Sequence, residues 1–188
     1  MTKRISLSET AQVIVRAHLK DGDVAVDATL GNGYDTVFLT QCVGETGHVY
    51  GFDIQVQALE STRLRLLERE MVNRATLFQA SHAEMTSYVP CRVRAIMFNL
   101  GYLPGSDKNI ITQADSTLLA LDQACRLLLE QGVMTVMAYP GHAGGEEEAV
   151  RVEQWLQQLK PLQYSSQIIF SQHHKVNAPR LFVIRKLG

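Results

Sequence analysis

The sequence has no long apolar run and few cysteines. No stretch approaches the roughly 18 consecutive apolar residues of a membrane span, and the start of the chain has no signal-peptide pattern. The three cysteines, Cys42, Cys91 and Cys125, lack the spacing of metal ligands or of a disulfide framework. We therefore expect a cytoplasmic protein with reduced thiols, no membrane partner and no bound metal.

A surplus of charge is also missing. Lysine and arginine together number 18, aspartate and glutamate 19, and the net charge of −1 does not indicate nucleic-acid binding. Basic side chains near the two ends of the chain could still form a local patch that contacts RNA, joined by a second subunit of a homodimer. An ordinary solvated surface explains them equally well. They are Lys3, Arg4, His173, His174, Lys175 and Arg180.

Residues 24–36 read as a strand, a glycine-rich turn and the start of a helix. Residues 24–26 form a short β-branched apolar run, which is typical of a buried parallel strand. Gly31 and Gly33 follow, and helical apolar periodicity begins near Gly33. Glycines let the backbone approach a ligand, and free N–H groups at a helix start favour an anionic group. The stretch therefore predicts a nucleotide-type cofactor site.

Asp53 supplies the second part of this predicted site. It follows a predicted strand at 48–52, about 20 residues after the glycines, where a carboxylate can accept hydrogen bonds from ribose hydroxyls. The alternative is a tight turn and a solvated aspartate with no ligand.

Two positions bear on the identity of the cofactor. A dinucleotide fingerprint needs a third glycine where this chain has Thr36, which disfavours NAD and a dehydrogenase. Asp27, at the end of the first strand, would repel a pyrophosphate but suits the ammonium group of an amino acid. The pattern Asp-x-Thr-x-Gly-x-Gly resembles the first motif of class I S-adenosylmethionine (SAM) methyltransferases. With the ribose carboxylate, the residues expected to bind SAM are Asp27, Thr29, Gly31, Asn32, Gly33, Asp35, Asp53 and Gln55.

The order of apolar runs predicts an α/β fold in one domain over residues 1–188. Helices are expected from Ser6 or Ser8 to before residue 21, from about 33 to 43, and at 56–67, 110–130 and 146–159, with Gly132 ending the fourth. Strands at 24–26, 48–52, 75–79, 94–99 and 133–139 alternate with these helices, and two more follow at 166–170 and 181–185. Alternation implies a doubly wound, mostly parallel sheet with helices on both faces. The closing pair resembles the hairpin of class I methyltransferases, so we predict seven strands in the order 3-2-1-4-5-7-6.

Ser81 and His82 follow the third predicted strand. Residues at this place often touch the adenine in SAM enzymes, so both are candidates for the adenine pocket. The alternative for His82 is a residue that only begins a helix.

The segment after the fourth strand carries the groups expected to hold a methyl acceptor. Asn99 and Tyr102 occupy the polar and aromatic places of the Asn/Asp-Pro-Pro-Tyr motif of amine methyltransferases. The side-chain oxygen of Asn99 and the carbonyl of Leu100 can each accept an N–H from an amine and so direct its lone pair. Tyr102 could stack on a target base. Leu100 and Gly101 replace the two prolines of the motif, and a plain strand-end turn is the alternative.

The glycine-rich loop after the fifth strand contains Tyr139 and His142. An alkylammonium with a pKa of about 10.4, by analogy with lysine, must lose a proton before its nitrogen attacks. Tyr139 or His142 could assist this step. The alternative for His142 is a loop residue without a chemical role.

Five ordered motifs, which begin at Asp27, Phe52, Asn99, Tyr139 and Asn177, recur together over residues 13 to 187. The set resembles the MnmM (YtqB-like) family of bacterial SAM-dependent tRNA wobble-uridine methyltransferases, formerly described as rRNA methylases. The resemblance implies SAM as cofactor and the anticodon stem-loop of tRNA as partner. The implied reaction converts 5-aminomethyl-2-thiouridine at position 34 to 5-methylaminomethyl-2-thiouridine. The chain departs from the expected family pattern at Leu30, at Tyr34 and in the loop at 177–179.

Without the resemblance, the residues indicate only that the protein is a SAM-dependent methyltransferase that acts on nitrogen. A methyltransferase that acts on rRNA or on a small-molecule amine stays open. So does a module that binds SAM or a nucleotide without turnover.

Overall fold

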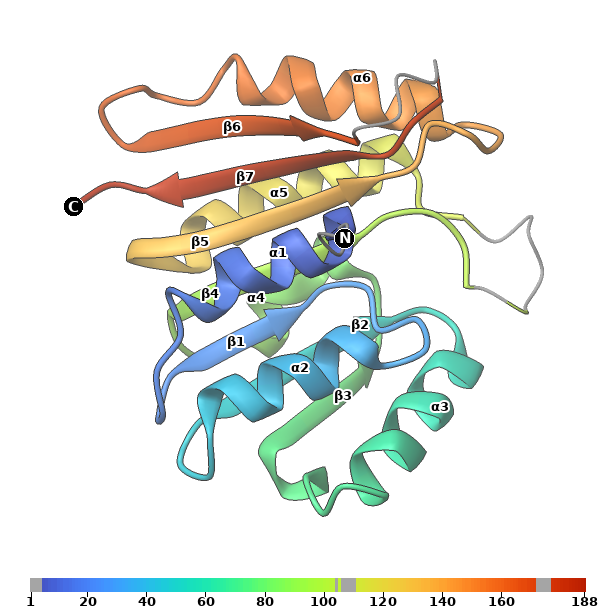
Figure 1. Cartoon of the computed structure of the whole chain (residues 1–188), viewed down its shortest axis with the longest axis vertical. Helices are drawn as coiled ribbons and strands as arrows, with labels where there is room; N and C mark the ends of the chain where they lie inside the picture. Colours follow the sequence, from blue (N-terminus) through green and yellow to red (C-terminus); the bar gives the residue numbers. More distant parts are fainter. Residues whose placement is uncertain (1–4, 104, 106–110, 172–176) are drawn as a thin grey trace.

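A computed structural model describes residues 5–103, 105, 111–171 and 177–188 of the chain. Its seven strands form one sheet in the order β3-β2-β1-β4-β5-β7-β6, which confirms the predicted order (Figure 1). Strands β1 to β5 run parallel, and β7 lies antiparallel to both β5 and β6. The strands are β1 Val24–Asp27, β2 His48–Asp53, β3 Ala75–Gln79, β4 Val93–Asn99, β5 Leu128–Ala138, β6 Tyr164–Phe170 and β7 Arg180–Lys186.

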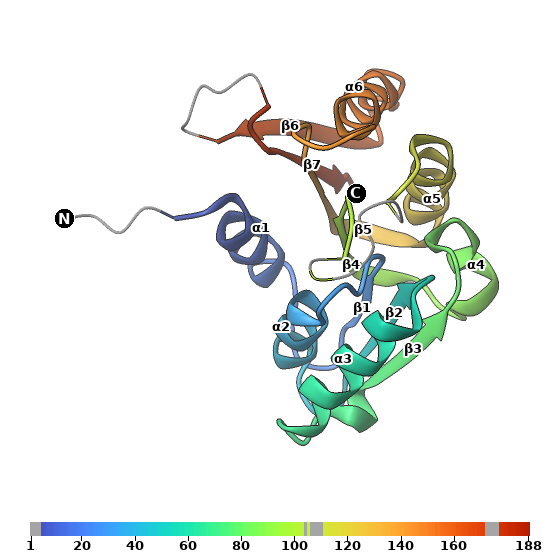
Figure 2. The ribbon, with the colours of Figure 1, turned by 90° about the vertical axis from the view of Figure 1, so that its right-hand side faces the viewer.

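Helices cover both faces of the sheet (Figure 2). On one face α2 contacts β1 and β2, α1 contacts β5 and β7, and α3 lies beside α2. On the other face α5 contacts both α4 and α6. The helices are α1 Leu7–Arg16, α2 Tyr34–Val43, α3 Val56–Leu67, α4 Met85–Tyr88, α5 Ala114–Leu127 and α6 Gly145–Leu156, with short 3-10 turns η1 Val72–Arg74 and η2 His82–Glu84. Among the described residues, no helix is both long and apolar enough to cross a membrane.

Successive residues of the central strands enter two different apolar cores. In β4, Ile96 and Phe98 pack with residues of α4, α5 and α6, while Ala95 and Met97 pack with residues of α1 and α2. Side chains of a strand alternate between its faces, and helices cover both faces here, so the whole run is buried. This burial explains the uninterrupted apolar sequence of β4. It also confines the polar loops to the two ends of the strands.

The start of α1 has a capping box. Ser6 Oγ accepts a hydrogen bond of 3.1 Å from the backbone N–H of Glu9, and the Glu9 carboxylate accepts one of 2.7 Å from the N–H of Ser6. Two backbone donors that the helix itself cannot pair are thereby satisfied. Ser6 is therefore the cap, whereas Ser8 lies within the helix and hydrogen-bonds to the side chain of Tyr139.

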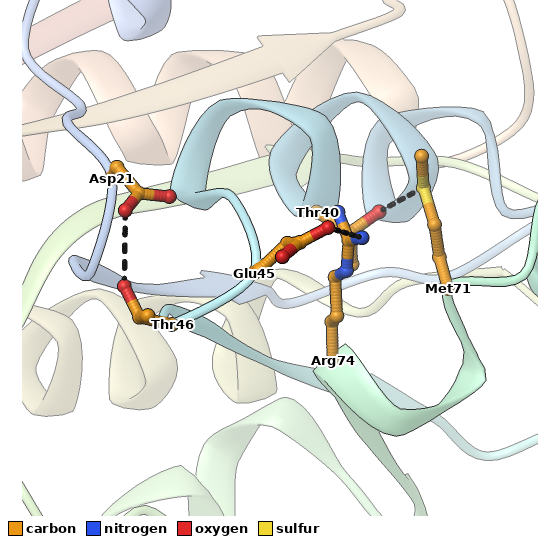
Figure 3. A network of polar contacts seen from close by, with 6 residues as sticks. All are labelled: Asp21, Thr40, Glu45, Thr46, Met71 and Arg74. Carbon is orange, nitrogen blue, oxygen red and sulfur yellow. Dashed lines mark hydrogen bonds and ion pairs between the residues drawn. The ribbon is translucent and has the colours of Figure 1, made fainter.

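Polar contacts hold the loops at the amino ends of the strands (Figure 3). The Thr46 hydroxyl donates to the Asp21 carboxylate across 3.1 Å, and Arg74 contacts Glu45 at 3.5 Å. Gly44 ends α2 with φ of 71°, and a β-carbon there would overlap the Asp21 carboxylate. A left-handed conformation and this close approach both require glycine at position 44. The turn from α2 to β2 is thus fixed at the edge opposite the strands' carboxyl ends.

The predicted boundary between the fourth helix and the fifth strand is wrong. The helix expected at 110–130 is α5, Ala114–Leu127, and Gly132 lies inside β5 instead of ending the helix. The pairing of β4 with β5 jumps from Leu128 to Val133, so the intervening residues form an irregularity in the ladder. Leu127 and Leu128 are buried on either side of the boundary, and apolar periodicity therefore gives no signal of it. The sequence also did not predict η2 and α4 between β3 and β4.

Candidate functional site

Two adjoining cavities lie where β1, β2, β4 and β5 end. Both are lined by Thr29, Gly31, Asn99, Gly101 and Tyr102. The first, called here the Asp53 cavity, is also lined by residues 52–55, 80–82 and 111–113. The second, called the Tyr139 cavity, has a volume of about 490 Å³, which is within the usual range of small-molecule sites. Its further lining residues include Asn32, Tyr34, Asp35, Tyr139, His142 and Asn177.

Asp53 stands at the end of β2 with its carboxylate held in place by backbone donors. The N–H of Gly31 donates to Oδ2 across 3.1 Å, and the N–H of Gln55 donates to Oδ1 across 3.0 Å. Burial raises the pKa of Asp53, and these backbone hydrogen bonds oppose the rise. Each carboxylate oxygen keeps a further lone pair for a ligand hydroxyl. Asp53, Gln55 and Gly31 therefore meet in one cavity, as the spacing in the sequence predicts.

The two glycines of the turn have different surroundings. Gly31, with φ of 51°, lines both cavities, and a β-carbon on it would meet nothing nearer than 3.9 Å. Gly33, with φ of 79°, lines neither cavity, and a β-carbon there would lie 2.8 Å from Cα of Thr62 in α3. The structure thus places Gly31 beside both cavities. Gly33 serves the packing of α2 against α3, in contrast to the expectation that it approaches the ligand.

Two carboxylates of the first motif lie at different depths. Asp27 is buried, accepts a hydrogen bond of 2.6 Å from the Thr36 hydroxyl and one of 3.2 Å from the N–H of Thr29, and lines neither cavity. Burial and, next, the charge of Asp35 raise its pKa well above the usual range. Asp35 lines the Tyr139 cavity, and Gln12 Nε2 donates to it across 3.0 Å. Asp35 is therefore the carboxylate that faces the Tyr139 cavity, and Asp27 fixes the turn.

Ser81 and His82 both line the Asp53 cavity. Ser81 Oγ accepts a hydrogen bond of 3.2 Å from the N–H of Ala83 and so begins η2. His82 Nδ1 lies 3.3 Å from the carbonyl of Ala28, and burial lowers the His82 pKa to about 4. A carbonyl can only accept, so Nδ1 carries the proton and Nε2 is left as an acceptor in the neutral ring. A neutral histidine with a free acceptor suits an exocyclic amine such as that of adenine.

Asn99 and Tyr102 lie at the junction of the two cavities. The backbone N–H of Asn99 donates to the Thr29 hydroxyl across 2.7 Å, which ties the end of β4 to the turn after β1. The Tyr102 ring meets the His142 ring edge to face, with centroids 5.8 Å apart. The loop after β4 and the loop after β5 therefore close on each other around the Tyr139 cavity.

Tyr139 and His142 differ in their capacity to take a proton. Burial raises the pKa of Tyr139, so its hydroxyl stays protonated at neutral pH and cannot act as a base. His142 Nδ1 lies 2.9 Å from the carbonyl of Ala143 and donates to it. Nε2 of His142 is buried and has no hydrogen-bond partner among the described residues, and a β-carbon on Gly101 would lie 3.4 Å from it. His142 thus presents an unpaired acceptor next to the loop after β4.

Sequence reasoning missed a buried network that supports this loop. The N–H of Gly101 donates to the Thr112 hydroxyl, which donates in turn to Glu148 in α6, both across 2.8 Å. Thr117 donates to the other oxygen of Glu148 across 2.6 Å, and only 2% of Glu148 is exposed. No sequence motif connects these positions. The acidic first turn of α6 was the only signal in the sequence, and it indicates a helix start and not a buried carboxylate.

The structure describes only one residue of the predicted basic patch, Arg180. His173, His174 and Lys175 lie outside the described residues, as do Lys3 and Arg4. Arg180 is described, and its guanidinium pairs with Glu146 at 2.8 Å and with Glu153 at 3.6 Å. Its side chain is only 15% exposed. The structure therefore commits Arg180 to α6, which argues against the expected phosphate contact. Within the described part of the chain, no three His, Cys, Asp or Glu side chains are placed to hold a metal ion.

Residues 49–185 match the family described as "Putative rRNA methylase". The chain is also 42% identical over 163 residues to a protein of Arabidopsis thaliana named chloroplastic tRNA (mnm5s2U34)-methyltransferase. That alignment covers 80% of this chain and 58% of the plant protein. The chain thus spans little more than half the length of this relative.

Two crystal structures match over their whole length. One, from Clostridium thermocellum, carries the same description as the family, is 38% identical and superposes with a TM-score of 0.95. The other, a Streptococcus mutans protein described as "a putative methyltransferase" in complex with S-adenosylhomocysteine (SAH), is 33% identical with a TM-score of 0.86. Each comparison covers 100% of both chains and shows the class I methyltransferase fold. The chain therefore belongs to the "Putative rRNA methylase" family.

Proposed function

We propose that this protein is a SAM-dependent methyltransferase that methylates the amine nitrogen of 5-aminomethyl-2-thiouridine at tRNA position 34. The observation that carries the proposal is the position of Asn99 between the cavity lined by Asp53 and His82 and the adjoining Tyr139 cavity of about 490 Å³. The name of the Arabidopsis relative supports the tRNA substrate, and the SAH in the Streptococcus mutans structure supports the cofactor.

The acceptor groups of the Asp53 cavity, together with Asp35 of the adjoining Tyr139 cavity, fit SAM. Asp53 presents two oxygens that Gly31 and Gln55 hold in a fixed orientation, which suits the two hydroxyls of a ribose. His82 offers a neutral acceptor, which suits an adenine amino group. Asp35, beside the turn, offers a carboxylate to an ammonium group. Bound SAM would supply a methyl group on a sulfonium. An amine nitrogen would attack this methyl carbon in line with the C–S bond, whose electron pair goes to sulfur.

The residues of the Tyr139 cavity then have to hold a neutral amine. The Asn99 side-chain oxygen can accept one N–H of the amine and so direct the nitrogen lone pair toward the Asp53 cavity. Alignment of this kind can supply a large part of a rate enhancement. Tyr102 lies on the same loop and can stack on the ring that carries the amine.

His142 is the residue that we assign to the proton. The amine must be deprotonated before attack, and the methylated product forms as an ammonium, which becomes neutral only when it loses one proton. Nε2 of His142 is an unpaired acceptor next to the loop of Asn99, whereas Tyr139 holds its own proton. His142 can therefore accept a proton from the amine, whereas Tyr139 can offer the amine only hydrogen bonds.

The test is methyl transfer from isotopically labelled SAM to tRNA that carries the aminomethyl group, followed by mass spectrometry of the nucleosides. We expect one labelled methyl group on the modified uridine, and none on the same tRNA without the aminomethyl group. Label in rRNA fragments or in a small amine instead would overturn the tRNA assignment. Binding of SAM without transfer to any acceptor would make the protein a SAM-binding module.

A further inference from the structure

Tyr34 and Arg65 form a paired surface at the rim of the Tyr139 cavity. Tyr34 is the first residue of α2, lines this cavity and is 64% exposed. The guanidinium carbon of Arg65, in α3, lies 3.9 Å from the centroid of the Tyr34 ring. Because α2 and α3 lie side by side, this contact joins two neighbouring helices at the entrance to the site (Figure 2).

A hydrogen bond from Arg65 to the backbone of the turn before α2 holds the pair in place. Arg65 Nε donates a hydrogen bond of 2.8 Å to the carbonyl of Asn32, which itself lines the Tyr139 cavity. Within the described part of the chain, Arg65 has no carboxylate partner, so its charge is not neutralised by an ion pair. The guanidinium covers one face of the ring, yet most of Tyr34 is exposed, so the other face is open to solvent. A ring that is fixed on one face and free on the other is a surface for stacking.

The exposure of the cavity's rings orders them from rim to interior. Tyr34 is 64% exposed and Tyr102 38%, whereas Tyr139 and His142 are partly buried. The reacting amine must reach Asn99. Tyr102 lies on the same loop as Asn99, whereas Tyr34 lies on α2. Tyr34 lines only the Tyr139 cavity, so its ring is not part of the adenosine side. A ligand group at Tyr34 therefore lies outside the adenosine side, at the rim of the cavity that holds the target.

We propose that Tyr34, backed by Arg65, is the stacking platform for a base of single-stranded RNA adjacent to the target nucleotide. The inference rests on the proposed function, because it needs an RNA substrate. Unpaired bases stack on aromatic side chains and on guanidinium planes, and the positive charge of Arg65 favours the neighbouring phosphates. The platform explains how a protein with a net charge of −1 can hold RNA beside its site without a large basic face.

The experiment uses the full chain and a fluorescent RNA stem-loop. The loop carries 2-aminopurine at one position next to the target uridine, and stacking on an aromatic ring lowers its fluorescence. We expect Tyr34→Ala to lose this quenching and to weaken stem-loop binding about tenfold, whereas Tyr34→Phe keeps both. Arg65→Ala should weaken binding and lower its salt dependence, and the control Arg63→Ala, with the same charge change on α3, should do so much less. SAM affinity should stay unchanged in all four variants.

The outcomes separate the platform from the proposed function. If the wild-type protein methylates the stem-loop and Tyr34→Ala binds and quenches as well as wild type, the platform is overturned and the function stands. Equal losses in Arg65→Ala and Arg63→Ala would show a general charge effect and overturn the role of the pair. A parallel loss of SAM affinity in Tyr34→Ala would move Tyr34 into the cofactor site. A wild-type protein that binds no RNA overturns both proposals.

Discussion

The hydroxyl of Thr112 joins the backbone N–H of Gly101 to the buried carboxylate of Glu148. Its two hydrogen bonds, both of 2.8 Å, connect the loop after β4 with α6. The N–H of Thr112 also donates to the carbonyl of Gly101 across 2.8 Å, so the two segments pair in both directions. The position of the Asn99 loop is therefore set by a carboxylate that lies outside both cavities.

The Thr112 contact can be tested with a matched pair of variants. Thr112→Val keeps the shape of the side chain but leaves the Gly101 N–H without its partner, and such a loss costs about 1–3 kcal/mol. We expect methyl transfer to fall about tenfold while SAM affinity changes little. Thr117→Val removes the other hydrogen bond to Glu148 and has no link to Gly101, so its turnover should stay near that of wild type. Equal turnover in the two variants, measured in single-turnover assays, would contradict the positioning role.

Asn99 is predicted to orient the acceptor amine. Asn99→Ala should lower the single-turnover rate by about 10²–10³, the typical cost of losing one well-placed polar group in an active site. SAM affinity should change much less, because the proposed ribose contacts come from Asp53. Asn99→Asp should keep partial activity, and its carboxylate should favour the protonated amine and raise the optimal pH. An equal loss of SAM affinity in Asn99→Ala would instead identify Asn99 as a cofactor ligand.

Asp53 is predicted to bind the ribose. Asp53→Ala removes two charge-assisted acceptors worth about 1.5–3 kcal/mol each, so SAM affinity should fall tenfold or more. The loss measured by calorimetry should be the same for SAM and SAH, because the two ligands carry the same ribose. Unchanged affinity in the variant would exclude Asp53 from the cofactor site.

Replacement of Gly33 by alanine should mainly lower stability, whereas replacement of Gly31 should mainly lower SAM affinity. Gly33→Ala sets a β-carbon against Thr62 at a φ of 79°, and steric strain of this kind costs about 1–3 kcal/mol. Each kcal/mol lowers the melting temperature by about 2–4 °C in a chain of this size. Gly31→Ala has the backbone strain of a φ of 51° but no steric clash, and it faces both cavities, so it should lower stability less than Gly33→Ala does and SAM affinity more. Thermal unfolding and calorimetry on both variants check the contrast, and a reversed pattern would exchange the two assignments.

His82 should make the fold sensitive to acid. Burial lowers its pKa to about 4, whereas the unfolded chain takes up the proton at the ordinary value of about 6.5. The unfolded state therefore binds more protons between these values, and stability falls by up to about 3 kcal/mol as the pH drops from 6.5 to 4. Raised pKa values have the opposite effect on the pH dependence of stability, and they occur at Asp27, Asp35 and Asp53. The relevant quantity is therefore the difference in pH dependence between wild type and a His82 variant.

The comparison is between wild type and His82→Gln, each unfolded by denaturant at several pH values. The variant should lose less free energy of unfolding than wild type between pH 6.5 and 4. Parallel pH profiles would show that His82 does not stay neutral in the folded protein.

The sequence alone determined the succession of strands and helices and the ends of the strands that carry the site, while the sheet order followed from the resemblance of the closing strand pair to class I methyltransferases. Apolar runs and glycine turns are local signals, and the carboxyl ends of parallel strands meet at one edge whatever the details. Asp53 and Asn99 could be placed there from their positions after strands. The end of α5 was not determined in this way, because Leu127 and Leu128 are buried in a helix and in a strand alike.

Only the tertiary structure decided which of these residues face a cavity. Asp27 and Asp35 belong to the same motif, but the first is buried behind the turn and the second lines a cavity. Gly33 meets Thr62, Tyr34 meets Arg65, and Thr112 meets Glu148, and each pair is separated by 29 to 36 residues. Such contacts depend on how helices pack on each other, and side-chain packing between distant segments leaves no period or motif in the sequence.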